Sequence, residues 1–112
     1  MMGTDYETRT LKPEIDEEGF LINGEKWTQE IAEILAREDV PAGLTDDHWA
    51  VVAFMREYYH LHDSVPPVRM VCRRTGLSMR RIKQLFPSGL TKGACRIAGI
   101  PRSTIRPNFL YP

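Results

Sequence analysis

The chain has 112 residues, which is enough for one domain with a single modest core. No run of about 18 or more apolar residues occurs, so we expect no membrane-spanning helix. The first ten residues combine neither a basic nor an apolar stretch, and we expect no signal peptide. Two cysteines, Cys72 and Cys95, do not make a disulfide framework, so the expected setting is the reducing cytoplasm.

The net charge of zero conceals two halves of opposite sign. All 15 acidic residues lie at or before Asp63, together with five basic residues, which gives this part a formal charge of −10. From Ser64 onward there are ten basic residues and no acidic one, a formal charge of +10. A basic half of this kind favours a polyanion or an acidic protein surface as partner. The alternative is that the two halves face each other and neutralise their charges.

The N-terminal part predicts little regular structure. Residues 1–10 are polar and we expect them to be disordered. Residues 11–22 have an extended pattern with turn residues at 16–19 and at 23–24, which predicts a small N-terminal β-hairpin.

Two helices are predicted to follow. Thr28 is a good N-cap for a helix that reaches about Arg37, and the break at residues 41–43 ends it. Thr45 caps the next helix, residues 46–62, which is the most apolar and is expected to be central. Its histidines share no spacing with cysteines or carboxylates that defines a metal site, and we expect surface or hydrogen-bonded roles for His48, His60 and His62.

Residues 68–86 have the spacing of a helix-turn-helix unit. Gly76 supplies the turn, Ser78 caps the second helix, and Cys72 is expected to be a small buried core residue. The unit either packs two helices compactly or presents a recognition helix to DNA. In the second case the nucleic-acid-binding residues are Arg73, Arg74, Arg80, Arg81 and Lys83.

A last short helix and a tail complete the chain. The apolar face of residues 90–98 predicts the helix, and Gly99 before Pro101 predicts its end. Three prolines in the last twelve residues exclude a regular helix there, so residues 101–112 are expected to form an irregular tail. The predicted fold class is therefore mainly α with a small β-hairpin, a compact helical bundle that contains the helix-turn-helix unit and ends in this tail.

Several fragments together resemble one family, that of the sulfur-relay proteins DsrC, TusE and DsvC, also called the gamma subunit of dissimilatory sulfite reductase. The fragments are LTDDHW (44–49), REYY (56–59), PPVRM (66–70), QLFPSG (84–89) and GACRIAGIP (93–101). The resemblance implies a DsrC/TusE-like domain over residues 11–100. It also implies that residues 101–112 form a flexible C-terminal arm that enters a partner, either a sulfite reductase or a sulfurtransferase.

Cys95 matches the first of two cysteines that carry sulfur in the dissimilatory members of this family. The second is the penultimate residue of those members, eleven positions later, and Arg106 stands there in this chain. The sequence PRSTIRPNFLYP also replaces the family's ending P-K-P-T-G-C-V. The two-cysteine cycle is therefore not expected here.

Cys95 remains the one candidate sulfur acceptor, with two interpretations. Neighbouring positive charge at Lys92 and Arg96 would lower its thiol pKa, whereas a position near a helix C-terminus disfavours the thiolate. The alternative is a small residue that packs the last helix. The residues expected to bind the partner are Lys92, Arg96, Pro101, Arg102 and Arg106.

Three functions from different classes follow. We expect a sulfur carrier that docks through its arm; the alternatives are a regulatory relative that binds DNA and an adaptor without chemistry. The sequence contains no paired acid and base, phosphate loop or metal-ligand cluster, so we expect neither an enzyme in its own right nor a cofactor.

Overall fold

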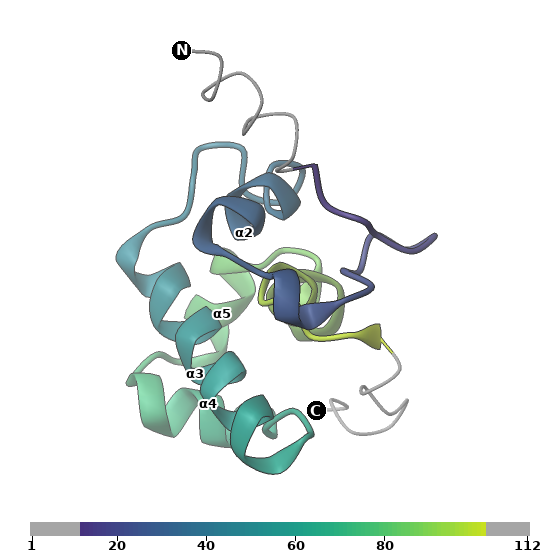
Figure 1. The fold of residues 1–112 in the computed structure, drawn as a ribbon. Helices are drawn as coiled ribbons and strands as arrows, with labels where there is room; N and C mark the ends of the chain where they lie inside the picture. The colour runs from purple at the N-terminus through teal and green to yellow at the C-terminus, as the bar shows by residue number, and fades with distance from the viewer. Residues whose placement is uncertain (1–11, 103–112) are drawn as a thin grey trace.

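The computed structural model describes residues 12–102, and α3 is the element around which the others are arranged (Figure 1). In chain order the elements are η1 (Gly24–Lys26), α2 (Gln29–Leu35), α3 (Asp46–His62), α4 (Val68–Thr75), α5 (Met79–Leu85) and η2 (Leu90–Cys95). Helix α3 contacts both α4 and η2, while α5 packs on α4. The bounds predicted for α3 are confirmed. No helix within residues 12–102 is long and apolar enough to cross a membrane.

Three helices begin at the side-chain caps that the sequence predicts. The hydroxyl of Thr28 accepts a hydrogen bond from the Ile31 N–H at 3.1 Å, and that of Ser78 accepts one from the Arg81 N–H at 3.0 Å. Thr45 caps α3 in a reciprocal arrangement with His48. These bonds satisfy N–H groups that have no partner inside their helices.

The core lies between α3 and the last part of the described chain. From α3 it takes the fully buried Val51, Val52 and Met55. The other side contributes apolar residues of α4, α5 and the segment after them, which include Val71, Ile82, Leu85, Phe86, Ala94, Cys95, Ile97, Ala98 and Ile100. A smaller cluster of Leu21, Ile31 and Leu35 holds the N-terminal segment against α2, and Trp27 packs against both clusters. The last segment is thus part of the core.

The predicted N-terminal β-hairpin is not confirmed. Ile15 and Leu21 form one isolated antiparallel bridge, and residues 12–102 contain no longer strand pairing. The carboxylate of Asp16 instead accepts the N–H groups of Glu18 at 2.8 Å and Phe20 at 2.9 Å, which closes a tight turn. Asn23 and Gly24 begin the 3₁₀ helix η1 rather than a second turn of a hairpin. The segment keeps main-chain bonds from the Asp16 N–H to the Phe20 carbonyl at 2.8 Å and from the Ile22 N–H to the Glu14 carbonyl at 3.0 Å, but this pairing is too short to make two strands.

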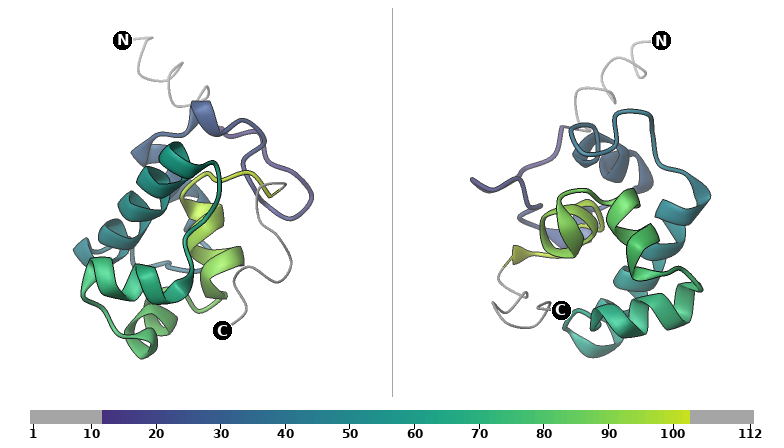
Figure 2. Two further views of the ribbon diagram at one scale, coloured as in Figure 1. Left: turned by 90° about the horizontal axis from the view of Figure 1, so that it is seen from below. Right: turned by 180° about the vertical axis from the view of Figure 1, so that it is seen from behind.

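Two elements after α3 also differ in detail from the prediction. Gly76 ends α4 with φ 78°, as a turn between α4 and α5 requires, but Cys72 is half-buried and packs at the edge of the core. The last helix is the π-helical η2, with a bond from the Ile100 N–H to the Cys95 carbonyl at 3.1 Å beyond it. Views from two sides show the segment after η2 beside the N-terminal segment (Figure 2).

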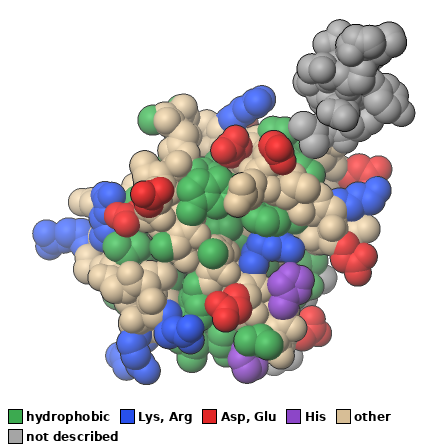
Figure 3. Space-filling view, turned by 60° about the vertical axis from the view of Figure 1, so that its left-hand side comes forward, with side chains coloured by type: hydrophobic (Ala, Val, Ile, Leu, Met, Phe, Trp, Pro, Cys, Tyr) green, Lys and Arg blue, Asp and Glu red, His purple; other side chains and the backbone are tan. Residues whose placement is uncertain are grey.

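The two oppositely charged halves meet within the molecule. The four ion pairs of residues 12–102 all join an acid of the first half to a base of the second: Arg81–Asp47, Arg96–Asp39, Arg102–Asp16 and Arg102–Glu18. On the face drawn in Figure 3, basic and acidic side chains are interspersed with apolar ones. The charge asymmetry of the sequence is thus partly neutralised by folding.

Candidate functional site

The thiol of Cys95 lies in the core at the end of η2. Its residue is 0 % exposed, and its neighbours Ala94, Ile97 and Ala98 are equally buried. Burial raises the pKa of the Cys95 thiol to about 12, because the apolar surroundings disfavour the thiolate. The expectation that neighbouring cations lower this pKa is therefore wrong for the folded conformation. In that state Cys95 is neutral and closed off from any sulfur donor.

Small residues explain why η2 places Cys95 inward. Gly93, Ala94 and Cys95 are three consecutive buried residues. A Cβ atom on Gly93 would lie 3.0 Å from Cβ of Phe86, so the chain approaches this ring only without a side chain. The close approach packs the whole turn against the core.

Arg96 faces away from the thiol and fastens η2 to α2. Its guanidinium donates to the Leu35 carbonyl at 2.8 Å and to the Lys92 carbonyl at 2.7 Å. It also lies 4.0 Å from the carboxylate of Asp39, and both side chains are largely buried. Arg96 is therefore engaged inside the molecule, whereas Lys92 is exposed.

Two side chains from distant parts of the chain hold the segment after Cys95. The indole N–H of Trp27 donates to the carbonyl of Ile97 at 2.9 Å, and the Arg56 guanidinium donates to the next carbonyl, that of Ala98, at 2.8 Å. The guanidinium also stacks over the Trp27 ring, 4.2 Å from its centroid. Desolvation lowers the pKa of Arg56, but an arginine remains protonated. We call Trp27 and Arg56 the arm clamp.

Glycines let the chain pass close to the arm clamp. Gly99 has φ 74°, and a Cβ atom on it would lie 2.4 Å from Cδ1 of Trp27. A Cβ atom on Gly24 would lie 3.0 Å from the Gly99 carbonyl oxygen and 3.7 Å from Cδ of Pro101. The main chain of residues 99–101 is therefore laid directly on the indole and on η1.

Arg102, the last described residue, is paired with the N-terminal turn. Its guanidinium lies 3.5 Å from the carboxylate of Asp16 and 3.7 Å from that of Glu18, and it is 55 % exposed. The hydrogen bond from the Phe20 N–H, with further contributions from Glu18 and Arg102, holds the pKa of Asp16 below its usual value. These contacts fix where the predicted arm leaves the body of the protein. Arg106 and the rest of the arm lie outside the described residues.

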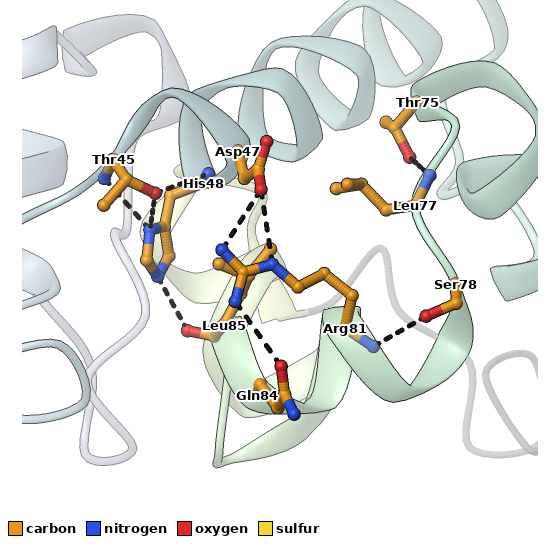
Figure 4. Close-up of polar contacts among 9 residues, drawn as sticks. All are labelled: Thr45, Asp47, His48, Thr75, Leu77, Ser78, Arg81, Gln84 and Leu85. Atoms are coloured by element: carbon orange, nitrogen blue, oxygen red, sulfur yellow. Dashed lines mark hydrogen bonds and ion pairs between the residues drawn. The ribbon is translucent and has the colours of Figure 1, made fainter.

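The basic residues of α4 and α5 do not form an unengaged set. All five are exposed, but Arg81 donates to Asp47 of α3 at 3.3 and 3.1 Å, as Figure 4 shows. Arg74 lies 5.0 Å over the ring of Phe54. Two of the five cations are thus held against α3. The use of this pair of helices as a DNA-binding unit stays a prediction.

The structure brings some of the predicted site residues together and adds two that the sequence did not suggest. Cys95, Arg96, Pro101 and Arg102 lie along one segment that Trp27 and Arg56 hold. Arg56 had one usable signal: it shares a helical stripe with Val52 and Tyr59, so a charge points toward the apolar side of α3. No spacing in the sequence pairs Trp27 with it. Within residues 12–102, no group of His, Cys, Asp or Glu is arranged to hold a metal ion.

Comparisons with known proteins identify the family. The profile of the family described as "DsrC like protein" matches residues 7–105. The chain is 35% identical over 91 residues to the gamma subunit of the dissimilatory-type sulfite reductase of Nitratidesulfovibrio vulgaris, covering 81% of this chain and 87% of that subunit. It is 32% identical over 105 residues to the sulfurtransferase TusE of Pectobacterium atrosepticum, covering 88% of this chain and 94% of that protein.

The fold agrees with this relationship. The crystal structure of the oxidized gamma subunit of the dissimilatory sulfite reductase (DsrC) from Archaeoglobus fulgidus matches at a TM-score of 0.71 and 39% identity, covering 80% of this chain and 88% of that one. None of these matches points to a nucleic-acid-binding protein. Because the family profile spans most of the sequence and relatives above 30% identity cover at least four fifths of it, the chain belongs to the DsrC-like protein family.

Proposed function

We propose that this protein is a sulfur-relay component that docks on a sulfite reductase or sulfurtransferase partner through its C-terminal arm. The observation that carries the proposal is the family relationship, because the relatives are named as a subunit of sulfite reductase and as a sulfurtransferase. The fixed exit of the arm at Arg102 supports docking by residues 103–112, since their starting point on the body is defined.

Cys95 is the candidate sulfur-bearing thiol in this proposal. Its thiolate attacks the outer sulfur of a donor persulfide, the donor's S–S bond breaks, and the donor leaves as a thiolate while Cys95 becomes a persulfide. No external oxidant or reductant is needed. The step requires an opened state, because the thiol is buried and its pKa is about 12 in the folded state.

An adaptor that docks without carrying sulfur is the second candidate. The burial of Cys95 favours it, and so does Arg106 at the position of the family's penultimate cysteine. Both candidates share the arm as the docking element and differ only in the use of the thiol.

A binding titration tests the docking. The probe is a purified dissimilatory sulfite reductase from which the gamma subunit has been removed. The full chain is expected to bind, a chain that ends at Arg102 is expected to bind at least about tenfold more weakly, and Cys95→Ala is expected to bind like the unaltered chain. Equal affinity of the shortened and the full chain would contradict docking through the arm.

A further inference from the structure

A buried thiol can take part in sulfur relay only if the protein opens around it. Cys95 is 0 % exposed, and so are Ile97, Ala98 and Ile100 in the segment that follows it. Arg96 and Ile97 still have helical geometry, whereas residues 98–101 do not. The main-chain bonds of the segment include those from the Ala98 N–H to Ala94 and from the Ile100 N–H to Cys95. It is also the part of the described chain that leads into the arm. Movement of this segment is therefore the most direct way to uncover the thiol.

The arm clamp is the structural element that resists this movement. Trp27 precedes α2 and Arg56 lies on α3, yet their donors bind the adjacent carbonyls of Ile97 and Ala98 at 2.9 and 2.8 Å. The two side chains stack on each other, so loss of one weakens the support of the other. Within residues 12–102, Arg56 has no carboxylate partner. Its hydrogen bond to the Ala98 carbonyl, at 2.8 Å, is shorter than its contact with His60, at 3.3 Å.

The close packing of Trp27 on Gly99 adds to the contacts that hold residues 97–101 in the closed position. The indole of Trp27 fills the space that a side chain at position 99 would need. On the outer side, a surface hollow of about 390 Å³ borders Arg56, Tyr59, His60 and Pro101. Solvent or a partner can therefore reach the clamp from outside, while the thiol lies in the core.

We propose that the Trp27–Arg56 clamp gates Cys95: the closed clamp holds residues 97–101 over the core, and its release opens this segment as a local unit and exposes the thiol. Local opening without global unfolding is a general property of segments held by a few bonds. The use of the exposed thiol for sulfur rests on the proposed function. The gate itself rests only on the contacts described above.

Alkylation of the two cysteines in the full chain tests the gate, because Cys72 serves as an internal reference. Cys72 is half-buried at the edge of the core, outside the gated segment. The protein is treated with iodoacetamide, and the modification of each cysteine is followed by peptide mass spectrometry. Trp27→Phe removes the indole donor and keeps a ring, whereas Arg56→Met keeps the length of the side chain and removes the guanidinium.

In each of these two variants, iodoacetamide is expected to alkylate Cys95 about tenfold faster, because one hydrogen bond that holds the segment is lost. The alkylation rate of Cys72 is expected to stay unchanged. Arg56→Lys, which retains a charged donor, is expected to restore part of the protection. Ile82→Val on α5 is the matched control, because it loosens the same core and removes neither hydrogen bond of the clamp. Its melting temperature and its Cys95 alkylation rate together show how much faster alkylation becomes when the protein is destabilised in general.

The proposal of a gate is wrong if the clamp variants raise the alkylation rate of Cys95 no more than Ile82→Val does at a comparable melting temperature. It is also wrong if Cys72 accelerates in parallel with Cys95. Neither readout involves a sulfur donor or a partner, so a protein that docks nowhere and carries no sulfur can still show the gate. The failure of one proposal is thus separable from the failure of the other.

Discussion

At the scale of single residues, Cys95 combines a chemically useful group with an environment that suppresses its chemistry. Its apolar surroundings raise the thiol pKa from the usual 9.0 to about 12. The nearest cation in sequence, Arg96, directs its guanidinium to Leu35, Lys92 and Asp39 instead. The Cys95 thiol is therefore neutral in the folded state, and it can react only when the structure around it opens.

This raised pKa predicts a loss of stability in alkaline solution. A thiol with a folded pKa above its unfolded value contributes stability that is fully present below pH 9 and is lost as the pH rises toward about 12. The expected slope of the unfolding free energy approaches about 1.4 kcal/mol per pH unit in that window. Denaturant titrations of the unaltered protein and of Cys95→Ala between pH 8 and 11 measure it. Parallel pH dependences of the two proteins would show that Cys95 does not titrate as a buried thiol.

At the scale of the elements, His48 connects the start of α3 to the end of α5. The Thr45 N–H donates to Nδ1 at 3.0 Å, so the proton is assigned to Nε2, which donates to the Leu85 carbonyl at 2.9 Å (Figure 4). The ring also packs edge-on against Phe86, with centroids 5.2 Å apart. The Arg81–Asp47 ion pair joins the same helices but is 44% and 43% exposed.

His48 and Arg81 both connect α3 to α5, but their substitution should lower the unfolding free energy by different amounts. His48→Ala leaves the Leu85 carbonyl and the Thr45 N–H without their partner and is expected to lower the unfolding free energy by about 2–3 kcal/mol. Arg81→Ala removes an exposed ion pair and is expected to cost less than about 1 kcal/mol. Urea denaturation of the two variants compares them. A larger loss for Arg81→Ala would mean that the surface pair, rather than the buried ring, joins the two helices.

The elements were predictable where local chemistry determines them. The caps at Thr28, Thr45 and Ser78 require only neighbours three residues away, and all three are confirmed. The N-terminal hairpin is not confirmed, because antiparallel pairing there is limited to the Ile15–Leu21 bridge around a tight turn that the Asp16 carboxylate closes. The π-helical winding of η2 and the close approach of Gly93 to Phe86 are not contained in the helical periodicity of the sequence.

In the candidate site, too, local sequence predicted some features and tertiary contacts determined the others. Cys95 was found from its sequence motif, but its burial comes from the core that it shares with residues of α3 and of the helices after it. The arm clamp joins positions 27, 56 and 97–98 across 70 and 42 residues of sequence. Only the fold brings these groups together, so no local pattern could predict their contact.

At the scale of the whole molecule, folding pairs part of a divided charge distribution internally. The acidic first half and the basic second half are linked by the four ion pairs of residues 12–102. The one with Asp39 ties η2 to the end of α2, and those of Arg102 tie the root of the arm to the N-terminal turn. The described part of this DsrC-like protein thus ends at Arg102, which the N-terminal turn holds, and Cys95 lies in the core beneath the segment that leads there.

Intact-mass spectrometry after incubation of the full chain with a persulfide donor tests the sulfur-relay function most directly. The account predicts a gain of one sulfur atom that a reductant reverses, that Cys95→Ser abolishes and that Cys72→Ser leaves in place. Absence of the adduct with a donor that loads a TusE protein in parallel would contradict the sulfur-carrying role and leave the adaptor. An adduct that survives Cys95→Ser would contradict the assignment of the thiol.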